Sequence, residues 1–183
     1  PTPSEIKYHE GTFKIPTKLS VYCQDGFLDD LLPVSPLPLN PSNEPSAPLH
    51  LVRQDFDHEE AFRVVCSSDK ITVFTPIVKT TLFALHLLKQ IFDSSEEAIP
   101  CFEINDRPIL RRRAFMLDVS RCKVPTLDSV FELIDLLCLL RFNEIQLYIE
   151  HTFAFQNHQK VWEEFSPFTG EEIRQIDHYL SLI

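Results

Sequence analysis

Glycine is scarce in this sequence. Only Gly11, Gly26 and Gly170 occur among the 183 residues. A loop that wraps a dinucleotide or a phosphate group with its backbone needs several closely spaced glycines, as in the GxGxxG pattern. No such cluster follows any strand that the sequence predicts, so dinucleotide binding is excluded as a function.

Metal-ligand patterns are lacking as well. The segment DHEEAF contains His58 and Glu59, but Phe62 stands where a zinc-binding HExxH helix needs its second histidine. The cysteines form no CxxC pair and have no histidine at ligand spacing. We expect reduced thiols, no metal and no cofactor, and we favour a reducing compartment such as the cytoplasm. The cysteines are Cys23, Cys66, Cys101, Cys122 and Cys138.

Long apolar runs are also missing. No stretch approaches the ~20 residues that a helix needs to cross a bilayer, and no signal-like segment opens the sequence. We therefore expect no membrane partner. The first residue is Pro1 rather than Met, which leaves room for a natural N-terminal segment ahead of it.

Positive charge is in short supply. There are 17 lysines and arginines against 27 acidic residues, which gives a formal net charge of -10. The averaged field of such a chain repels phosphate backbones, so we do not expect nucleic acid as a partner. The one basic cluster, Arg111 to Arg113, is expected to be solvated or paired with local acids.

Residues 1–107 are predicted to form a small α+β domain. Residues 12–23 predict one or two edge strands, and residues 33–48, with six prolines, predict an extended loop without helix or strand pairing. Three apolar segments follow with strand periodicity, the last two joined as a hairpin, and one amphipathic helix is expected to cover their sheet. These four elements are predicted at 49–54, 61–67, 70–75 and 79–92.

After Pro108 the pattern changes to strand, helix, strand, helix. Residues 113–119 are nearly continuously apolar, as is typical of a parallel strand covered by helices on both faces. A helix is predicted over 126–141, with Thr126 as its cap and Asn143 at its end, and a second strand over 144–150. The order predicts an α/β fold, either an open doubly wound sheet or the start of a (β/α)8 barrel.

The last predicted helix begins after a capping-box pattern formed by Thr169 and Glu172. The loop before it, residues 152–168, contains His158 and Trp162. A loop of this length is often functional, and a tryptophan suits stacking on a sugar ring. The alternative is packing against the strands, which we favour for Phe153, Phe155, Phe165 and Phe168.

Polar residues stand at the C-terminal ends of both predicted strands of 108–183. The first strand leads into Asp118, Ser120 and Arg121, and the second into Glu150 and His151. In parallel α/β folds the loops after these ends converge on one mouth. The sequence therefore predicts a binding site there.

Each of these residues has a structural alternative. Asp118 lies in an apolar run, so a structural pair with Arg121 or with a neighbouring strand explains it equally well. The guanidinium of Arg121 suits a pair of hydroxyls or a carboxylate, and we favour ligand contact. Because Glu150 and His151 are adjacent, we expect one of the two to face the mouth.

The same residues resemble a known family. Residues 113–121, RAFMLDVSR, are similar to the first barrel strand of the glycoside hydrolase family 20 β-N-acetylhexosaminidases, whose pattern is Arg, a small residue, apolar positions, Asp, a small pair and Arg. The run VPTLDSVFELIDLLCLLRFNEIQLYIEHTFAF, with NHQKVWEEFSP after it, resembles bacterial members. The likeness covers about residues 49–183. Ala114 replaces a usual Gly, and Cys122 and Lys123 replace a usual His and aromatic.

The resemblance implies a small domain at 1–107 and the first part of a (β/α)8 catalytic barrel at 108–183. It implies that Arg121 holds hydroxyls of the terminal sugar, that Asp118 supports it, and that Glu150 and His151 contact substrate. In such enzymes the 2-acetamido oxygen of the substrate attacks the anomeric carbon, while an Asp orients it and a neighbouring Glu is the acid and base. No residue of this chain matches that Asp-Glu pair, so we expect it after Ile183.

A closed barrel has eight strands and typically ~250 residues. We therefore expect a fragment that is inactive by itself and prone to aggregate. Its expected partner is the remainder of the barrel. The leading interpretation is part of a retaining exo-β-N-acetylhexosaminidase that removes terminal N-acetylated amino sugars. The alternatives are a non-catalytic carbohydrate-binding or scaffolding domain, and a (β/α)8 enzyme that uses another hydrolytic route.

Overall fold

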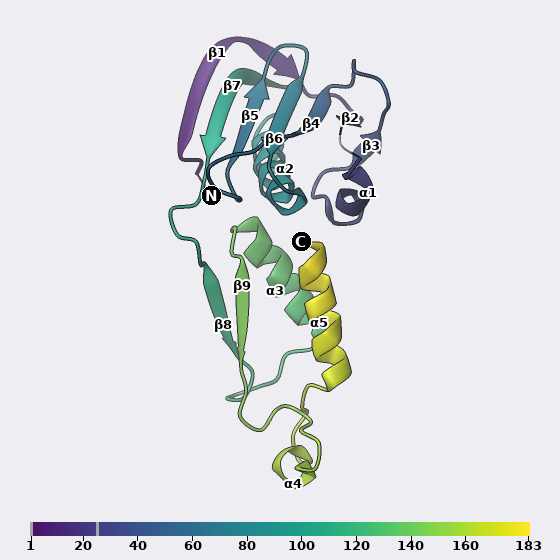
Figure 1. Cartoon of the computed structure of the whole chain (residues 1–183), viewed down its shortest axis with the longest axis vertical. Coiled ribbons are helices and arrows are strands. Elements are labelled where there is room, and N and C mark those ends of the chain that lie inside the picture. The colour runs from purple at the N-terminus through teal and green to yellow at the C-terminus, as the bar shows by residue number, and fades with distance from the viewer. Residues whose placement is uncertain (1, 25) are drawn as a thin grey trace. The chain divides into compact units, whose positions relative to one another are not determined.

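The computed structural model describes residues 2–24 and 26–183, and the chain divides into two compact units, Pro1–Ile109 and Leu110–Ile183. Figure 1 labels the elements of both. No helix in the described part of the chain is long and apolar enough to span a membrane.

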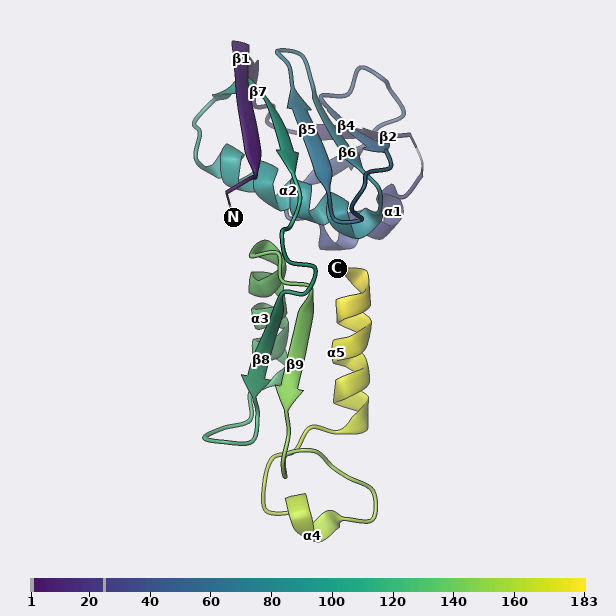
Figure 2. The ribbon, with the colours of Figure 1, turned by 60° about the vertical axis from the view of Figure 1, so that its left-hand side comes forward.

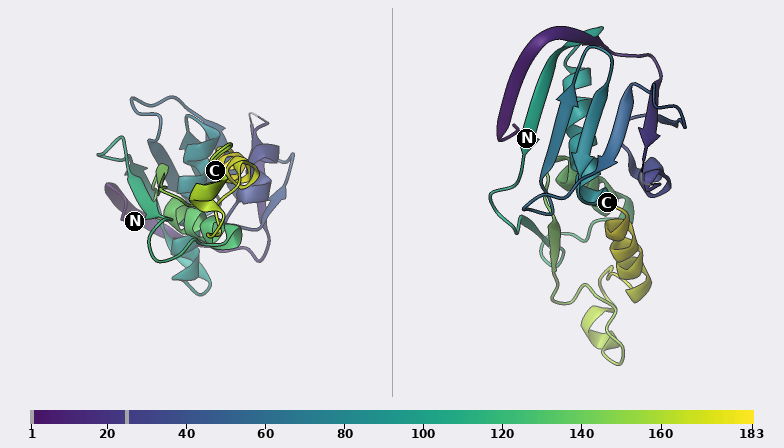
Figure 3. Two further views of the ribbon diagram at one scale, coloured as in Figure 1. Left: turned by 90° about the horizontal axis from the view of Figure 1, so that it is seen from below. Right: turned by 45° about the horizontal axis from the view of Figure 1, so that its top comes forward.

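Unit 1 is a mixed sheet with a helix on one face. Among its described residues the sheet has seven strands in the order β1-β7-β5-β6-β4-β2-β3. Figure 3 shows the strands as one layer with the long helix α2 behind them. The strands are β1 (Glu5–Lys14), β2 (Leu19–Cys23), β3 (Leu39–Pro41), β4 (Leu49–Arg53), β5 (Phe62–Cys66), β6 (Ile71–Thr75) and β7 (Ala98–Asp106), and the helices are α1 (Leu28–Leu31), η1 (Leu32–Val34) and α2 (Val78–Asp93).

Alternating burial fixes which face of this sheet is covered. In β5 and β6 every second residue is fully buried, as the two-residue period of a strand requires when one face packs on a helix. The apolar residues of α2 recur at helical spacing, and Leu82, Leu85 and Leu88 have no exposed surface. The three predicted strands, the antiparallel β5–β6 hairpin and the helix are confirmed.

The prediction that 33–48 contains no helix or ladder is wrong in part. Pro33 lies in the 3-10 turn η1, where the missing N–H is not needed. Residues Leu39–Pro41 form β3, which pairs in parallel with β2 at the edge of the sheet. An edge strand bonds through one side only, so a proline at its end is tolerated.

The sequence analysis names no element at 98–106, where β7 lies between β1 and β5. Pro100 in this segment argues against a central strand, because it cannot donate to a ladder. In the structure Pro100 lies opposite Thr12, next to a bulge in β1 between His9 and Thr12. Gly11 occupies this bulge with φ 103°, and a Cβ there would be 3.3 Å from the Sγ of Cys101.

Unit 2 consists of two strand–helix pairs. The strands β8 (Ala114–Asp118) and β9 (Glu144–Tyr148) pair in parallel over their full length, with Asp118 opposite Tyr148. Figure 2 shows them side by side, followed by the loop that carries α4. The helices are α3 (Leu127–Leu139), α4 (Gln159–Trp162) and α5 (Gly170–Leu182). The predicted fold class, a small α+β unit followed by two βα units, is confirmed, and the described strands of unit 2 form no closed barrel.

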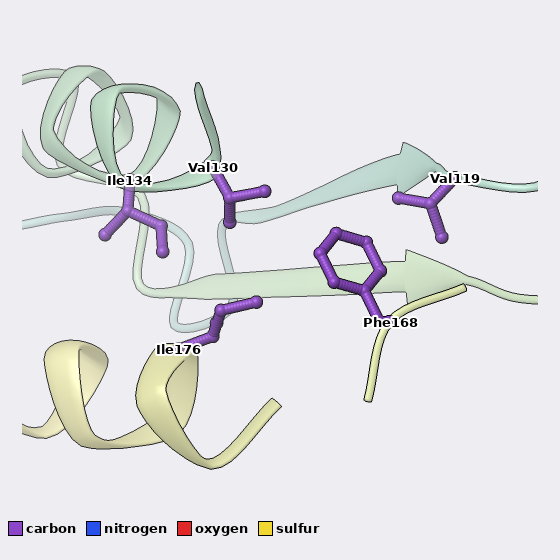
Figure 4. Packing of buried hydrophobic residues seen from close by; sticks show 5 residues of the cluster. All are labelled: Val119, Val130, Ile134, Phe168 and Ile176. Atoms are coloured by element: carbon purple, nitrogen blue, oxygen red, sulfur yellow. The ribbon is translucent and has the colours of Figure 1, made fainter. Parts of the chain in front are cut away.

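One apolar cluster joins the elements of unit 2. Val119 follows β8, Val130 and Ile134 belong to α3, Ile176 belongs to α5, and Phe168 precedes it. Each of these side chains is at most 4% exposed, and Figure 4 shows them pointing toward one another. Burying side chains of this size contributes about 1.5–3 kcal/mol each before the entropy cost, so the cluster is the main source of cohesion in the unit.

The opposite face of the β8–β9 pair is open. Leu117 packs on the apolar cluster, so its neighbour Met116 points away from it, and Met116 is 60% exposed. This corrects the prediction of helices on both faces of this strand. On α3, Leu136 is 50% exposed and Leu140 is 46% exposed, so this helix also keeps an uncovered apolar side.

The predicted helix starts are confirmed, and one helix end is not. The Oγ of Thr126 accepts from the N–H of Ser129, and Thr169 and Glu172 form a complete capping box. The predicted terminator Asn143 is wrong, because α3 ends at Leu139 and Arg141 takes the left-handed conformation with φ 63°. Asn143 instead ties loop to strand, since its Oδ1 accepts from the N–H of Arg113 at 2.9 Å.

We predict that Thr169→Ala lowers the free energy of unfolding by about 1 kcal/mol, because the hydroxyl no longer accepts from the N–H of Glu172 or donates to its carboxylate. Urea denaturation followed by circular dichroism measures this. Asp177→Ala, at an exposed position within α5, is the control and should change stability by less than about 0.5 kcal/mol. Equal losses in the two variants would show that the cap contributes nothing.

Candidate functional site

The C-terminal ends of β8 and β9 bring four polar side chains together. Asp118 and Tyr148 are register partners, so their side chains share a face of the strand pair. Arg121 and Glu150 each follow the end of a strand and contact Tyr148. We call Asp118, Arg121, Tyr148 and Glu150 the strand-end cluster.

Asp118 anchors the cluster through its two carboxylate oxygens. Its Oδ1 accepts from the backbone N–H of Ser120 at 3.0 Å and of Arg121 at 3.1 Å, and its Oδ2 accepts from Nε of Arg121 at 2.6 Å. These donors, the N–H of Ser120 foremost, hold the pKa of Asp118 below its usual value. The side chain is 31% exposed, so it is a half-buried, fully partnered carboxylate.

Arg121 is held on two sides. Its Nε is bonded to Asp118, and its Cζ lies 4.7 Å from the centre of the Tyr148 ring. The hydrogen bond to Asp118 raises the pKa of Arg121, which is therefore charged at every working pH. Among the described residues the only hydrogen bond of its side chain uses Nε, and the side chain is 64% exposed, so both Nη groups are accessible to a ligand.

The chain turns sharply after Arg121. Cys122 has φ 73°, a left-handed conformation that costs a non-glycine residue free energy, and the N–H of Lys123 bonds to the carbonyl of Arg121. Such conformations concentrate at functional sites. The turn keeps Arg121 beside the strand ends and away from the helix that follows.

Glu150 joins the cluster through side chain and backbone. The Oη of Tyr148 donates to its Oε1 at 2.8 Å, and this bond raises the pKa of Tyr148. The backbone N–H of Glu150 donates to the Oγ of Ser120 at 2.6 Å. That Oγ also lies 3.0 Å from Oγ1 of Thr152, which is 2% exposed, so the two strand ends are tied together by hydroxyls.

Of the two adjacent candidates after β9, Glu150 lies in the cluster and His151 does not. The ring of His151 packs against Phe165, with 4.1 Å between ring centres. The structure therefore brings together Asp118, Arg121 and Glu150 and places His151 on the loop that follows.

The aromatic loop behaves differently from its prediction. Phe168 is buried and Phe153 is half-buried on the apolar cluster, as expected. Phe155 is 39% exposed and Phe165 is 50% exposed. Each packs on one neighbouring ring, Phe155 on Phe153 and Phe165 on His151, so the predicted packing is confirmed for these two only in part. Trp162 donates its Nε1–H to the carbonyl of Phe155 at 3.0 Å. This bond joins two parts of the loop to each other, and the aromatic composition alone does not predict it.

The prediction from sequence did not include Tyr148 in the site. It lies inside an apolar strand, where an aromatic residue usually indicates packing. The available signal is position, because Tyr148 precedes Glu150 by two residues and therefore shares its face in an extended chain. Ser120 was placed at the strand end, but its bond across to Glu150 required the pairing of β8 with β9.

The basic cluster at the start of β8 has structural roles. Arg112 forms an ion pair with Glu144 at the opposite end of the strands from the strand-end cluster. Arg113 donates from Nε to the carbonyl of Arg141 at 2.6 Å. The expectation of local pairing is confirmed for Arg112.

The hollows, the cysteines and the acidic residues in the rest of the described chain form no second site of clustered reactive side chains. Two hollows of about 560 and 260 Å³ lie in the described part of unit 1. Among the residues that line the larger, only Tyr8 is ionisable. Burial raises the pKa of the Cys66 thiol to about 12, so it is not a nucleophile near neutral pH. Across 2–24 and 26–183, no group of three or more His, Cys, Asp or Glu side chains is arranged to hold a metal ion.

We predict that the Asp118 carboxyl titrates below the usual range of aspartate. In Arg121→Gln its pKa should rise only part of the way, because the N–H of Ser120 still donates to it. Since the folded-state pKa is lowered, the stability from this group is present above its unfolded pKa and is lost as pH falls through the folded one. The ¹³C shift of the carboxyl carbon against pH measures both values, and an ordinary pKa in the parent chain would refute the assignment.

Comparison with known proteins places the fold. The sequence matches no family model and no curated protein. Among solved structures, the chain superposes on the β-N-acetylhexosaminidase of Bacteroides fragilis with TM-score 0.81 and 20% identity over 99% of this chain and 42% of that one. It superposes on the chitobiase of Flavobacterium johnsoniae with TM-score 0.78 and 22% identity over 98% of this chain and 32% of that one.

A third neighbour was solved with a sugar. It is the glycoside hydrolase family 20 exo-β-N-acetylglucosaminidase of Vibrio harveyi in complex with N-acetylglucosamine, with TM-score 0.80 and 19% identity over 100% of this chain and 34% of that one. The chain thus spans well under half the length of the neighbours it matches. It has the fold of part of the family 20 β-N-acetylhexosaminidases, as the RAFMLDVSR segment predicts.

Proposed function

We propose that this chain is part of a retaining exo-β-N-acetylhexosaminidase that removes terminal N-acetylated amino sugars, and that the strand-end cluster binds the terminal sugar. The observation that supports this most is the state of Arg121, whose guanidinium is fixed through Nε while its Nη groups are accessible. A fixed planar fork binds a pair of hydroxyls with less loss of side-chain entropy than a mobile one.

The fold likeness supports the same proposal. Neighbours with TM-scores of 0.78 to 0.81 are hexosaminidases, and the Vibrio harveyi enzyme holds N-acetylglucosamine. In parallel α/β folds ligands bind at the C-terminal strand ends, which is where the strand-end cluster lies. Glu150 supplies carboxylate acceptors beside the Arg121 donors, and a sugar hydroxyl needs both kinds of partner.

In this proposal residues 1–107 form the small domain and residues 108–183 open the (β/α)8 barrel. The open face of β8 and β9, with Met116 60% exposed, then lines the interior of the complete barrel. The exposed apolar side of α3 at Leu136 and Leu140 packs against further barrel elements. The coverage of 32 to 43% in the neighbours is what this arrangement predicts.

The chain supplies binding groups but not the acid and base of the reaction. The sequence has no adjacent Asp-Glu pair. In substrate-assisted cleavage the acetamido oxygen of the substrate is the nucleophile, an Asp orients it, and a Glu gives a proton to the leaving oxygen and later takes one from water. We place that pair on a later strand, outside the 183 residues.

A non-catalytic carbohydrate-binding role is the second candidate. One observation favours it: an accessible guanidinium and a carboxylate lie at one site, and these two groups suffice to bind a sugar without an acid or a base. Both candidates predict sugar binding at Arg121, and they differ in whether a longer protein that contains this chain cleaves a glycoside.

We predict that the 183-residue chain does not hydrolyse an aryl β-N-acetylglucosaminide. The measurement is release of the aryl alcohol over many hours, with a family 20 hexosaminidase as positive control. Turnover by the purified chain that persists after gel filtration would contradict the assignment of the acid and base to a later strand.

We also predict that N-acetylglucosamine binds at the strand ends. Titration with the methyl β-glycoside should shift the amide signals of Arg121 and Glu150 in ¹H–¹⁵N spectra. Arg121→Ala should weaken this binding about tenfold or more, since a hydrogen bond to a charged group contributes about 1.5–3 kcal/mol.

The matched control is Arg112→Ala. It removes an equally exposed arginine that is ion-paired at the other end of the same strands, and it should leave the sugar affinity unchanged. An unaltered dissociation constant in Arg121→Ala, with the fold retained, would remove the proposed role of the strand-end cluster.

A further inference from the structure

We propose that Tyr148 is a positioning residue that holds Arg121 and Glu150 in one fixed arrangement for the ligand. The inference rests on the proposed function for the identity of the ligand, while the positioning itself is a property of the folded chain. The residue acts through its neighbours, so its effect is on affinity and orientation.

The ring of Tyr148 supports the guanidinium. The Cζ of Arg121 lies 4.7 Å from the ring centre, which is within the range of a cation–π contact. The carboxylate of Asp118 bonds to Nε of the same group at 2.6 Å. A hydrogen bond at Nε fixes one nitrogen of the guanidinium but still allows its plane to turn about that bond. A flat ring across its face restricts that motion, so the two contacts together define the direction of the Nη groups.

The hydroxyl of Tyr148 orients the carboxylate. Its Oη donates to Oε1 of Glu150 at 2.8 Å. The backbone of Glu150 is already fixed by its bond to the Oγ of Ser120 at 2.6 Å. A glutamate side chain has three rotatable bonds, and the phenol fixes its far end. The Oε2 oxygen then has a defined place from which to accept a ligand hydroxyl.

The platform itself is rigid. Tyr148 is the last residue of β9 and the register partner of Asp118. A tyrosine side chain has only two torsions between its backbone and its ring, so the position of the strand largely fixes where the ring and the hydroxyl lie. One side chain thus sets the spacing between a cationic donor and an anionic acceptor.

Two substitutions separate the two contacts. Tyr148→Phe keeps the ring beneath Arg121 and removes the bond to Glu150. Tyr148→Leu removes both. The control is Tyr179→Phe, which deletes a tyrosine–carboxylate bond of 2.6 Å to Asp135 on the helices of the same unit.

The first measurement needs no ligand. The Nε–H signal of Arg121 in ¹H–¹⁵N spectra carries the ring-current shift of Tyr148. We expect this signal to be kept in Tyr148→Phe and in Tyr179→Phe, and to move toward the unstructured position in Tyr148→Leu. An unchanged Arg121 signal in a folded Tyr148→Leu chain would overturn the proposal. If that variant does not fold, Tyr148→Phe and Glu150→Gln still test the hydroxyl contact.

The second measurement follows the phenol. The charged and titratable groups that face Tyr148 are Glu150, Arg121 and Asp118, and the bond to Glu150 is the largest cause of its raised pKa. Glu150→Gln should therefore lower the pKa of Tyr148 toward its ordinary value, as seen in the ¹³Cζ shift. A pKa that does not move in Glu150→Gln would show that the phenol does not hold this carboxylate.

The third measurement is affinity for methyl N-acetyl-β-glucosaminide. We expect the dissociation constant to rise about threefold in Tyr148→Phe and about tenfold in Tyr148→Leu, with Tyr179→Phe unchanged. If Arg121→Ala leaves sugar binding intact while Tyr148→Leu still moves the Arg121 signal, the positioning stands and the sugar function falls. If Arg121→Ala abolishes binding and both Tyr148 variants bind as the parent does, the positioning falls.

Discussion

The parallel pairing of β8 with β9 is the constraint on which the candidate site depends. Because Asp118 lies opposite Tyr148, a residue that follows each strand by two or three positions is brought to the same end. A slip of one residue would send Tyr148 to the helix-covered face and separate Arg121 from its ring. The hydroxyl of Ser120, bonded to the N–H of Glu150, holds this register beyond the last strand residue.

The apolar cluster of unit 2 stabilises the pairing of β8 with β9. Val119 and Phe168 lie just beyond the strands and pack with Val130, Ile134 and Ile176 of the two helices. Packing is confined to one face, and the other face carries the polar residues of the strand-end cluster together with exposed Met116. A single-sided core is therefore compatible with a site on the opposite face, because the two functions use alternate residues of the same strands.

Electrostatics then refine the site. Asp118 satisfies both backbone donors and Nε of Arg121, so its charge is used within the cluster and is not presented to a ligand. The accessible charges are the Nη groups of Arg121 and the carboxylate of Glu150. The structural alternative for Asp118 and the ligand role proposed for Arg121 are thus compatible, because the pair uses one nitrogen of the guanidinium and leaves two.

Sequence periodicity predicted the elements that are strongly amphipathic, among them the β5–β6 hairpin, α2, and the βαβα order after Pro108. It wrongly predicted no ladder at β3 and named no element at β7. Both segments contain a proline, and tolerance of a proline depends on a facing bulge or on an edge position in the assembled sheet. Local patterns identify what one segment does alone and cannot report which neighbour it will have.

The same division applies to the site. The sequence by itself determined the fold class, the helix caps at Thr126 and Thr169, and the presence of Asp118, Arg121 and Glu150 at strand ends, because these follow from local periodicity and hydrogen bonding. Only the tertiary structure decided that Glu150 and not His151 joins the cluster, and that Tyr148 links it to Arg121. The contact of Arg121 with Tyr148 and the bond of Glu150 to Ser120 join residues 27 and 30 positions apart through the pairing of two strands, and cross-strand geometry is fixed only when the chain has folded.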